Sequence, residues 1–195
     1  VVEREQYLGE IDAIAGDGDH GRGMVRGLRA ACEAVADTEL GAGGTLRTAG
    51  AAWADNGGGS SGVLWGALLE KAGDVIGDQD TPDAQTVAGA VKEGAEAVMR
   101  LGGAKPGDKT MLDALLPFVA ALQGAQAPLP QAWQKAAETA TESAERTKEL
   151  IPKVGRARPL GEKSLGTPDP GAVSLALCAQ VVGEVLRETC GGERA

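Results

Sequence analysis

The apolar residues of the chain recur with a helical period over most of its length. In residues 23–36, for example, Met24, Leu28, Ala31 and Val35 are spaced by three or four positions, which places them on one face of a helix. The same period predicts further helices over residues 1–14, 45–54, 63–76, 81–101, 110–122, 130–150 and 171–189. No segment shows the alternation that is typical of a strand. The pattern therefore predicts an all-α chain of roughly eight helices.

The composition agrees with tightly packed helices and restricts the class of partner. Alanine, glycine and leucine dominate, and aromatic side chains make up 3% of the 195 residues. Thirty glycines are more than helices favour, so many of them should lie in turns with a specific role. The formal net charge of −9 argues against nucleic acid or an anionic membrane as the main partner. No apolar run approaches the length of a membrane span.

The cysteines and the histidine do not form a pattern that binds zinc. The chain has three cysteines and one histidine, with no pair of cysteines at the usual spacing. An odd number of cysteines in a helical chain indicates reduced thiols, and we therefore expect a cytoplasmic protein. Cys32 and Cys178 fall in apolar helical stretches and are expected in the core.

The first glycine-containing loop carries three aspartates, Asp12, Asp17 and Asp19. On a continuous helix, positions 12 and 17 would diverge by roughly 140°. They converge if the helix breaks between them, and Gly16 and Gly18 permit that break. Three converging carboxylates repel one another unless a cation lies between them. Oxygen ligands alone suit a hard cation such as magnesium or calcium.

This loop has two other possible interpretations. A calcium-binding EF-hand that started at Asp17 would need glycine at its sixth position and glutamate at its twelfth, where the chain has Arg22 and Leu28. The EF-hand interpretation therefore fails. The alternative for each aspartate taken singly is a helix cap on a solvated loop.

A second loop, residues 56–62, reads Asn-Gly-Gly-Gly-Ser-Ser-Gly and opens a helix. Unobstructed amides at a helix N-terminus favour an anion, and the hydroxyls of Ser60 and Ser61 add donors. No Gly-Lys-Ser/Thr follows, as a Walker A loop requires, and no strand precedes the loop, as a Rossmann fingerprint requires. The alternative is a glycine linker that ends in a serine cap.

Two further loops carry candidate chemistry. In residues 105–113, Asp108 is expected to cap the following helix, and Met111 is either a contact for a flat ring or a core residue. In residues 155–171, Arg156, Arg158 and Lys163 indicate a phosphate or an acidic partner. The alternative for this last loop is a solvated surface segment.

Four motifs in this order resemble the L domain of dihydroxyacetone kinases, also called the DhaL domain. They are Gly-Asp-Gly-Asp-His-Gly (16–21), Gly-Gly-Ser-Ser-Gly (58–62), Pro-Gly-Asp-Lys-Thr-Met-Leu-Asp (106–113), and the segment from Gly-Arg-Ala to Asp-Pro-Gly-Ala (155–172). The resemblance covers nearly the whole chain. It implies an antiparallel barrel of eight helices that binds a nucleotide, ADP or ATP, in the loops at one end.

The resemblance also implies roles for individual residues. Asp12, Asp17 and Asp19 match aspartates that bind two magnesium ions bridging the phosphates. Arg156 matches an arginine near the terminal phosphate, and these four residues are the candidate catalytic set. The other nucleotide contacts that the resemblance implies are His20, Gly58, Gly59, Ser60, Ser61, Gly103, Thr110, Met111, Pro168, Asp169 and Gly171.

The chain departs from the family pattern in two places. The family often has Ser-Tyr after Gly-Arg-Ala, where this chain has Arg158 and Pro159. The family's L domain also has about one more helix before the position of Val1. We expect residues 1–195 to form a single L domain. The alternatives are a domain without its first helix and a segment of a longer kinase that joins a K and an L domain.

The function implied is that of a phosphoryl-donor domain in an ATP-dependent kinase. A separate K domain would carry a small ketose such as dihydroxyacetone covalently on a histidine, so this chain would supply half of an active site. One alternative is an L subunit that retains ADP and is rephosphorylated by a phosphotransferase-system protein. Others are the nucleotide domain of a fatty-acid kinase and a regulatory module that binds a nucleotide and a transcription factor.

Overall fold

The computed structural model describes residues 1–78, 81–155 and 157–191. Within them the chain is helical, and no strand occurs in these ranges. Arg156, the candidate arginine of the terminal phosphate, lies outside the described residues. The α-helices are α1 (Glu5–Asp12), α2 (His20–Val35), α3 (Ala42–Asn56), α4 (Gly59–Ile76), α5 (Ala84–Gly102), α6 (Leu112–Gln123), α7 (Leu129–Arg146) and α8 (Pro170–Gly191). Three short 3-10 helices accompany them: η1 (Val2–Arg4), η2 (Thr147–Glu149) and η3 (Arg158–Ser164).

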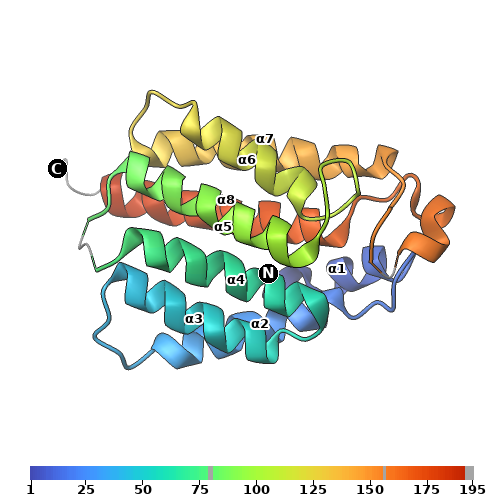
Figure 1. Ribbon diagram of the computed structural model, residues 1–195, viewed down its shortest axis with the longest axis horizontal. Coiled ribbons are helices and arrows are strands. Elements are labelled where there is room, and N and C mark those ends of the chain that lie inside the picture. Colours follow the sequence, from blue (N-terminus) through green and yellow to red (C-terminus); the bar gives the residue numbers. More distant parts are fainter. Residues whose placement is uncertain (79–80, 156, 192–195) are drawn as a thin grey trace.

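The helices form a closed ring in the order of the chain. Each α-helix packs against the next one, and α8 packs against α1 as well as against α6 and α7. Figure 1 shows the long helices side by side along the long axis of the molecule. Because consecutive helices alternate in direction, the connections α1–α2, α3–α4, α5–α6 and α7–α8 gather at one end. The expected antiparallel helical barrel is confirmed.

Glycines let α3 and α4 approach to backbone contact. A Cβ added to Gly66 of α4 would lie 2.8 Å from the Gly50 carbonyl oxygen of α3, and one added to Gly73 would lie 2.6 Å from the Gly43 carbonyl oxygen. Such distances leave no room for a side chain. These helical glycines therefore serve helix packing, a use that the glycine content alone did not predict.

Alanines have the same purpose on α7, where they form the buried face of the helix. Ala136 and Ala140 have no exposed surface. Helix α7 packs between α6 and α8, and the indole of Trp133 donates a hydrogen bond to the Ala179 carbonyl oxygen of α8 at 2.8 Å. Larger side chains fill the space between α3 and α4, where the rings of Trp53 and Trp65 stack with centroids 5.1 Å apart.

Several helix boundaries differ from the sequence prediction. Helix α2 begins at His20 instead of residue 23, and α4 begins at Gly59 instead of residue 63. The expected long loop over residues 155–170 contains η3. Cys32, expected in the core, is exposed, whereas Cys178 is partly buried.

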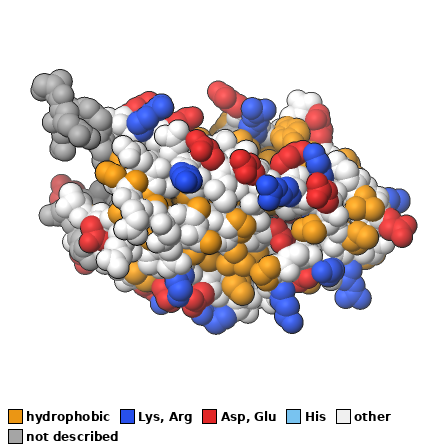
Figure 2. All heavy atoms as spheres, turned by 90° about the horizontal axis from the view of Figure 1, so that it is seen from above, with side chains coloured by type: hydrophobic (Ala, Val, Ile, Leu, Met, Phe, Trp, Pro, Cys, Tyr) orange, Lys and Arg blue, Asp and Glu red, His pale blue; other side chains and the backbone are white. Residues whose placement is uncertain are grey.

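The outer surface mixes both signs of charge. Acidic and basic side chains lie among small apolar areas on the face shown in Figure 2. The described part of the chain contains no helix long and apolar enough to cross a membrane.

Candidate functional site

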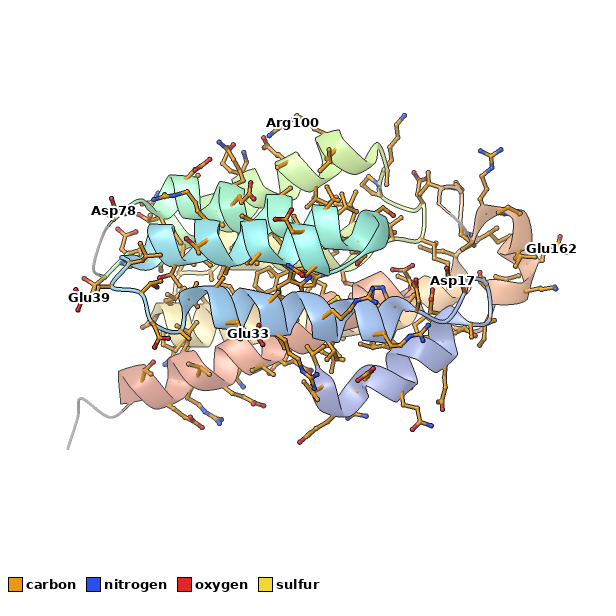
Figure 3. All side chains as sticks on the ribbon, turned by 90° about the horizontal axis from the view of Figure 1, so that it is seen from below. Asp17, Glu33, Glu39, Asp78, Arg100 and Glu162 are labelled. Atoms are coloured by element: carbon orange, nitrogen blue, oxygen red, sulfur yellow. The ribbon has the colours of Figure 1, made fainter. Side chains whose placement is uncertain are left out.

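A pocket of about 300 Å³ opens at one end of the barrel. This is the end where the connections α1–α2, α3–α4, α5–α6 and α7–α8 gather. Its lining comes from the α1–α2 and α3–α4 loops, the α5–α6 turn and the segment before α8. Figure 3 shows Asp17 and Glu162 at this end, with Glu39 and Asp78 at the other. The sequence singled out the same four loops, so the barrel brings all four motifs to one place.

The acidic loop brings three carboxylates together. Helix α1 ends at Asp12, and Asp19 precedes the first residue of α2. Gly18 has a φ of 74°, which a side chain would disfavour, and this residue turns the chain between the two helices. Carboxylate oxygens of Asp12, Asp17 and Asp19 all lie within 4.8 Å of one another. The predicted break and convergence are therefore confirmed.

This cluster fits a hard divalent cation. Three carboxylates supply oxygen ligands alone, which suit magnesium, and thiolate or imidazole ligands are absent from the cluster. Asp12 also accepts a hydrogen bond from the His20 backbone amide at 3.3 Å, which helps to orient its carboxylate. The number of ions that the cluster would hold stays a prediction.

His20 joins the start of α2 to α8. Its Nε2 lies 3.0 Å from the Ser174 hydroxyl oxygen. Burial lowers the pKa of His20, although the charge of Asp12 and the Pro170 carbonyl act in the opposite direction. The neutral imidazole is therefore favoured at neutral pH, and His20 acts as a hydrogen-bonding group instead of a fixed positive charge.

The glycine-serine loop forms the start of α4 itself. Gly58 precedes the helix with a φ of 74°, and Ser60 and Ser61 lie in its first turn. The first amides of a helix have no acceptor within the helix, and the positive end of the helix dipole lies there. Gly58, Gly59, Ser60 and Ser61 all line the pocket. The amide end of α4, a geometry that suits an anion, therefore lines the same pocket as the acidic cluster.

Arg26 is a basic residue of the pocket that the sequence analysis missed. A Cβ added to Gly58 would lie 2.6 Å from the Arg26 guanidinium nitrogen Nη2, so this guanidinium covers the glycine-serine loop. Arg26 also lines the pocket. Its position seven residues after Asp19, two turns along the same helix face, is the signal that could have revealed it.

The α5–α6 turn differs in detail from the prediction. Asp108 does not cap α6, because its carboxylate accepts from the Lys105 amide at 2.8 Å and α6 begins at Leu112. Met111 is 6% exposed and belongs to the core, as one of its two interpretations expected, and it also lines the pocket. Its contact with a flat ring stays a prediction. Gly103 ends α5 in the left-handed conformation and does not itself line the pocket among the described residues.

The segment before α8 contributes one unusual carboxyl group. The Asp169 carboxylate accepts from the Ala172 amide at 2.8 Å at the start of α8. The pKa of Asp169 is raised to about 7, chiefly by burial of the carboxyl group and to a smaller extent by the charge of Asp113. The hydrogen bond from the Ala172 amide and the charge of Lys109 oppose this rise. Arg158 and Lys163 are exposed and, within the described residues, are not part of the pocket lining.

The pocket combines most of the expected residues with an excess of negative charge. The expected residues that line it are Asp12, Asp17, Asp19, His20, Gly58, Gly59, Ser60, Ser61, Thr110, Met111, Pro168, Asp169 and Gly171. The four aspartates are opposed by two basic side chains among the described lining residues, Arg26 and Lys109. A phosphate group would therefore need an accompanying cation to bind here.

Comparison with known proteins gives a consistent result. A family model described as the DAK2 domain matches residues 14–184. The chain is 52% identical to a D-erythrulose kinase of Mycolicibacterium smegmatis, over 99% of the chain and 34% of that protein. It is 53% identical to an L-erythrulose kinase of Pectobacterium atrosepticum, over 95% of the chain and 32% of that protein. It therefore spans about a third of the length of these kinases.

A shorter relative and a solved structure match over most of this chain. The chain is 32% identical to the Escherichia coli ADP-binding subunit DhaL of a PEP-dependent dihydroxyacetone kinase, over 94% of the chain and 89% of that subunit. The crystal structure of the dihydroxyacetone kinase of C. freundii matches with a TM-score of 0.75 and 30% identity, over 94% of the chain and 32% of that structure. The same kinase in complex with AMP-PNP and Mg²⁺ matches with a TM-score of 0.70.

Proposed function

The chain belongs to the DAK2 domain family, and from this membership we propose that it binds a nucleotide with magnesium and supplies the phosphoryl donor of a small-ketose kinase. One structural observation carries the proposal. A cluster of three carboxylates and the amide end of α4 lie on the walls of one pocket. The first suits a divalent cation and the second suits phosphate.

Different residues would bind the cation and the phosphate groups of the nucleotide. Asp12, Asp17 and Asp19 would hold the cation, which offsets negative charge on the phosphoryl group during transfer. The amides at the start of α4, with the hydroxyls of Ser60 and Ser61, would bind phosphate oxygens.

The flanking residues complete this assignment. We include Arg26 among the groups that offset phosphate charge, because its guanidinium covers Gly58. Arg156 keeps its proposed place near the terminal phosphate. Met111 and Pro168 line the same pocket and supply apolar surface for the adenine ring.

The sugar would bind to a separate K domain. The erythrulose kinases to which the chain is 52% and 53% identical are about three times as long as the segment that matches, so the remaining length has room for such a domain. We propose a ketotetrose such as erythrulose as the preferred substrate class, with dihydroxyacetone as a smaller alternative.

The ADP-retaining subunit is the second candidate, because the chain also covers 89% of the Escherichia coli subunit DhaL. The two candidates differ in how they treat ADP. An ATP-dependent kinase has to release ADP in each cycle, whereas a subunit rephosphorylated in place keeps it. We propose ATP as the donor, because the relatives of higher identity are named erythrulose kinases without the word PEP-dependent that the name of the Escherichia coli protein carries.

The decisive experiment mixes this chain with the sugar-binding domain of an erythrulose kinase. We expect transfer of the γ-phosphate of labelled ATP to D- or L-erythrulose, with a lower rate on dihydroxyacetone and exchange of bound ADP within the cycle. Asp17→Asn should abolish transfer, whereas Asp37→Asn, an exposed residue beyond the end of α2, should not. Nucleotide binding without transfer to any of these sugars would contradict the kinase and support a regulatory module.

A further inference from the structure

Lys109 combines two features that are unfavourable for a lysine. Its side chain lies in the interior, with 5% of the residue exposed. Its backbone has a φ of 61°, and among the described residues it alone of the non-glycines has a positive φ. Lysine is rarely buried without a partner, and residues other than glycine seldom adopt a positive φ. Specific contacts must therefore hold Lys109 in place.

The three protons of the Lys109 ammonium group all have acceptors within the protein. Its Nζ donates to the Leu150 carbonyl oxygen at 3.1 Å, to the Ser164 carbonyl oxygen at 2.7 Å and to the Ser164 hydroxyl at 3.0 Å. These acceptors are 41 and 55 residues away in the sequence. Because an ammonium group has three protons to donate, this one has none left for a phosphate oxygen.

Both segments joined by Lys109 continue into the pocket wall. Thr110 and Met111 follow it directly, and Asp169 lies five residues after Ser164. Further bonds strengthen the connection: the Lys153 amide donates to the Asp108 carbonyl oxygen at 3.2 Å, and the Asp169 amide donates to the Thr147 hydroxyl at 2.7 Å. The bonds of the ammonium group to Leu150 and Ser164 add to these connections between the same segments.

The pKa shifts of Lys109 and Asp169 indicate that the two groups interact inside the protein. Burial lowers the pKa of Lys109, and the charge of Asp169 opposes that shift. Lys109 in turn opposes the rise in the pKa of Asp169. The ammonium group of Lys109 and the carboxyl group of Asp169, just before α8, therefore interact electrostatically.

We propose that Lys109 is a positioning residue for nucleotide binding. By fastening the α5–α6 turn to Leu150 and Ser164, it would fix the pocket wall at 110–111 relative to the wall at 168–171, so that a nucleotide meets a preformed site. The inference rests on the proposed function, because it requires that this pocket bind a nucleotide. Lys109 itself does not touch the phosphates. Pre-organisation of this kind contributes to affinity by reducing the ordering cost on binding.

Two substitutions separate the ammonium group from the backbone turn. Lys109→Gly removes the side chain and leaves a residue that adopts a φ near 60° without strain. Lys109→Met removes the ammonium group and keeps an apolar stem of similar length. Lys109→Arg retains a charged donor and serves as the conservative variant. Lys163→Met, next to Ser164 but exposed and outside the described pocket lining, is the matched control.

The measurement is calorimetric binding of ADP with excess magnesium, beside binding of Mn²⁺ alone, below the melting transition of each variant. We expect Lys109→Gly and Lys109→Met to raise the Kd of ADP by about tenfold to a hundredfold. The Kd of Mn²⁺ should stay within about twofold, because the aspartates lie on another loop. Lys109→Arg should recover part of the ADP affinity, and Lys163→Met should bind as the wild type does.

Other outcomes would overturn the inference. An unchanged Kd of ADP in both Lys109→Gly and Lys109→Met would overturn the positioning role alone, while a wild-type chain that binds no nucleotide would overturn the proposed function with it. An equal loss of ADP and Mn²⁺ binding would show a general structural role instead. If both variants fail to fold, Ser164→Ala replaces them, because it removes one acceptor of Lys109. This variant is expected to weaken ADP binding more than Lys163→Met does. Equal affinities of the two variants for ADP would contradict the proposal.

Discussion

The carboxyl group of Asp169 has a pKa far above its ordinary value. Its carboxyl group is enclosed, although the residue as a whole keeps some exposure. The rise of its pKa to about 7 means that the folded chain binds a proton there between about pH 4 and pH 7 that the unfolded chain has released. Its contribution to stability is therefore present at low pH and is lost as the pH rises towards 7.

This sign can be tested with Asp169→Asn, which keeps a residue suited to the start of a helix and removes the titration. The free energy of unfolding of the wild type, relative to the variant, is expected to fall between pH 5 and pH 8 by at most about 3 kcal/mol. His20 changes stability in the opposite direction, since its lowered pKa costs stability as the pH falls below 6.5, but both proteins share it. Denaturant unfolding at several pH values would contradict the shift if the difference were flat.

Arg26 provides a second test that concerns a single residue. Its guanidinium lies over the loop that would bind phosphate, so Arg26→Ala should weaken the binding of ADP with magnesium by about tenfold, the effect of losing a charged hydrogen bond. Arg29, one turn further along α2, is exposed and is not part of the described lining. Arg29→Ala should therefore bind nucleotide normally. Equal small effects in the two variants would remove Arg26 from the site.

At the scale of helices, glycine has two separate uses in this protein. In the loops, Gly18 and Gly58 have a positive φ and shape the site. Within α3 and α4, Gly50 and Gly66 let two backbones touch. The α3–α4 pair carries the glycine-serine loop at its end, so close packing of these helices also determines where the phosphate-binding amides lie.

Gly66→Ala and Gly89→Ala form a matched pair for this use of glycine. A Cβ at Gly66 would lie 2.6 Å from the Ala54 Cβ, so the first variant should lose about 1–3 kcal/mol of stability through overpacking. A Cβ at Gly89 in α5 would meet nothing within 4 Å, so the second should gain up to about 1 kcal/mol from its better helix propensity. Thermal unfolding of both variants provides the comparison, and a stable Gly66→Ala would contradict the close packing.

For the molecule as a whole, the net charge of −9 and the aspartates of the pocket repel a nucleotide. We expect excess chelator to weaken ADP binding by at least about a hundredfold, with affinity restored by magnesium. Added salt in the presence of chelator should recover a part of that loss, because it screens the repulsion. Calorimetry in chelator that showed unchanged affinity would contradict the cation between protein and phosphate.

The sequence alone determined the helical class and most of the site. Helical period is a local property, so the helices were predicted to within a few residues at most ends. The helix break between Asp12 and Asp17 was predicted because Gly16 and Gly18 permit it and because the aspartates converge only if the helix breaks. The order of four motifs identified the family, and with it most of the expected residues that line the pocket between Asp12 and Gly171. The roles of these residues in binding a nucleotide stay predictions.

Tertiary structure decided the remainder, because it depends on groups that are distant in the sequence. Period alone placed Cys32 on an apolar face, yet the ring of helices leaves that position exposed. Arg26 belongs to the site only because α2 lies against the glycine-serine loop. The role of Lys109 depends on acceptors 41 and 55 residues away, and no local pattern specifies which carbonyl oxygens will lie within reach of a folded ammonium group.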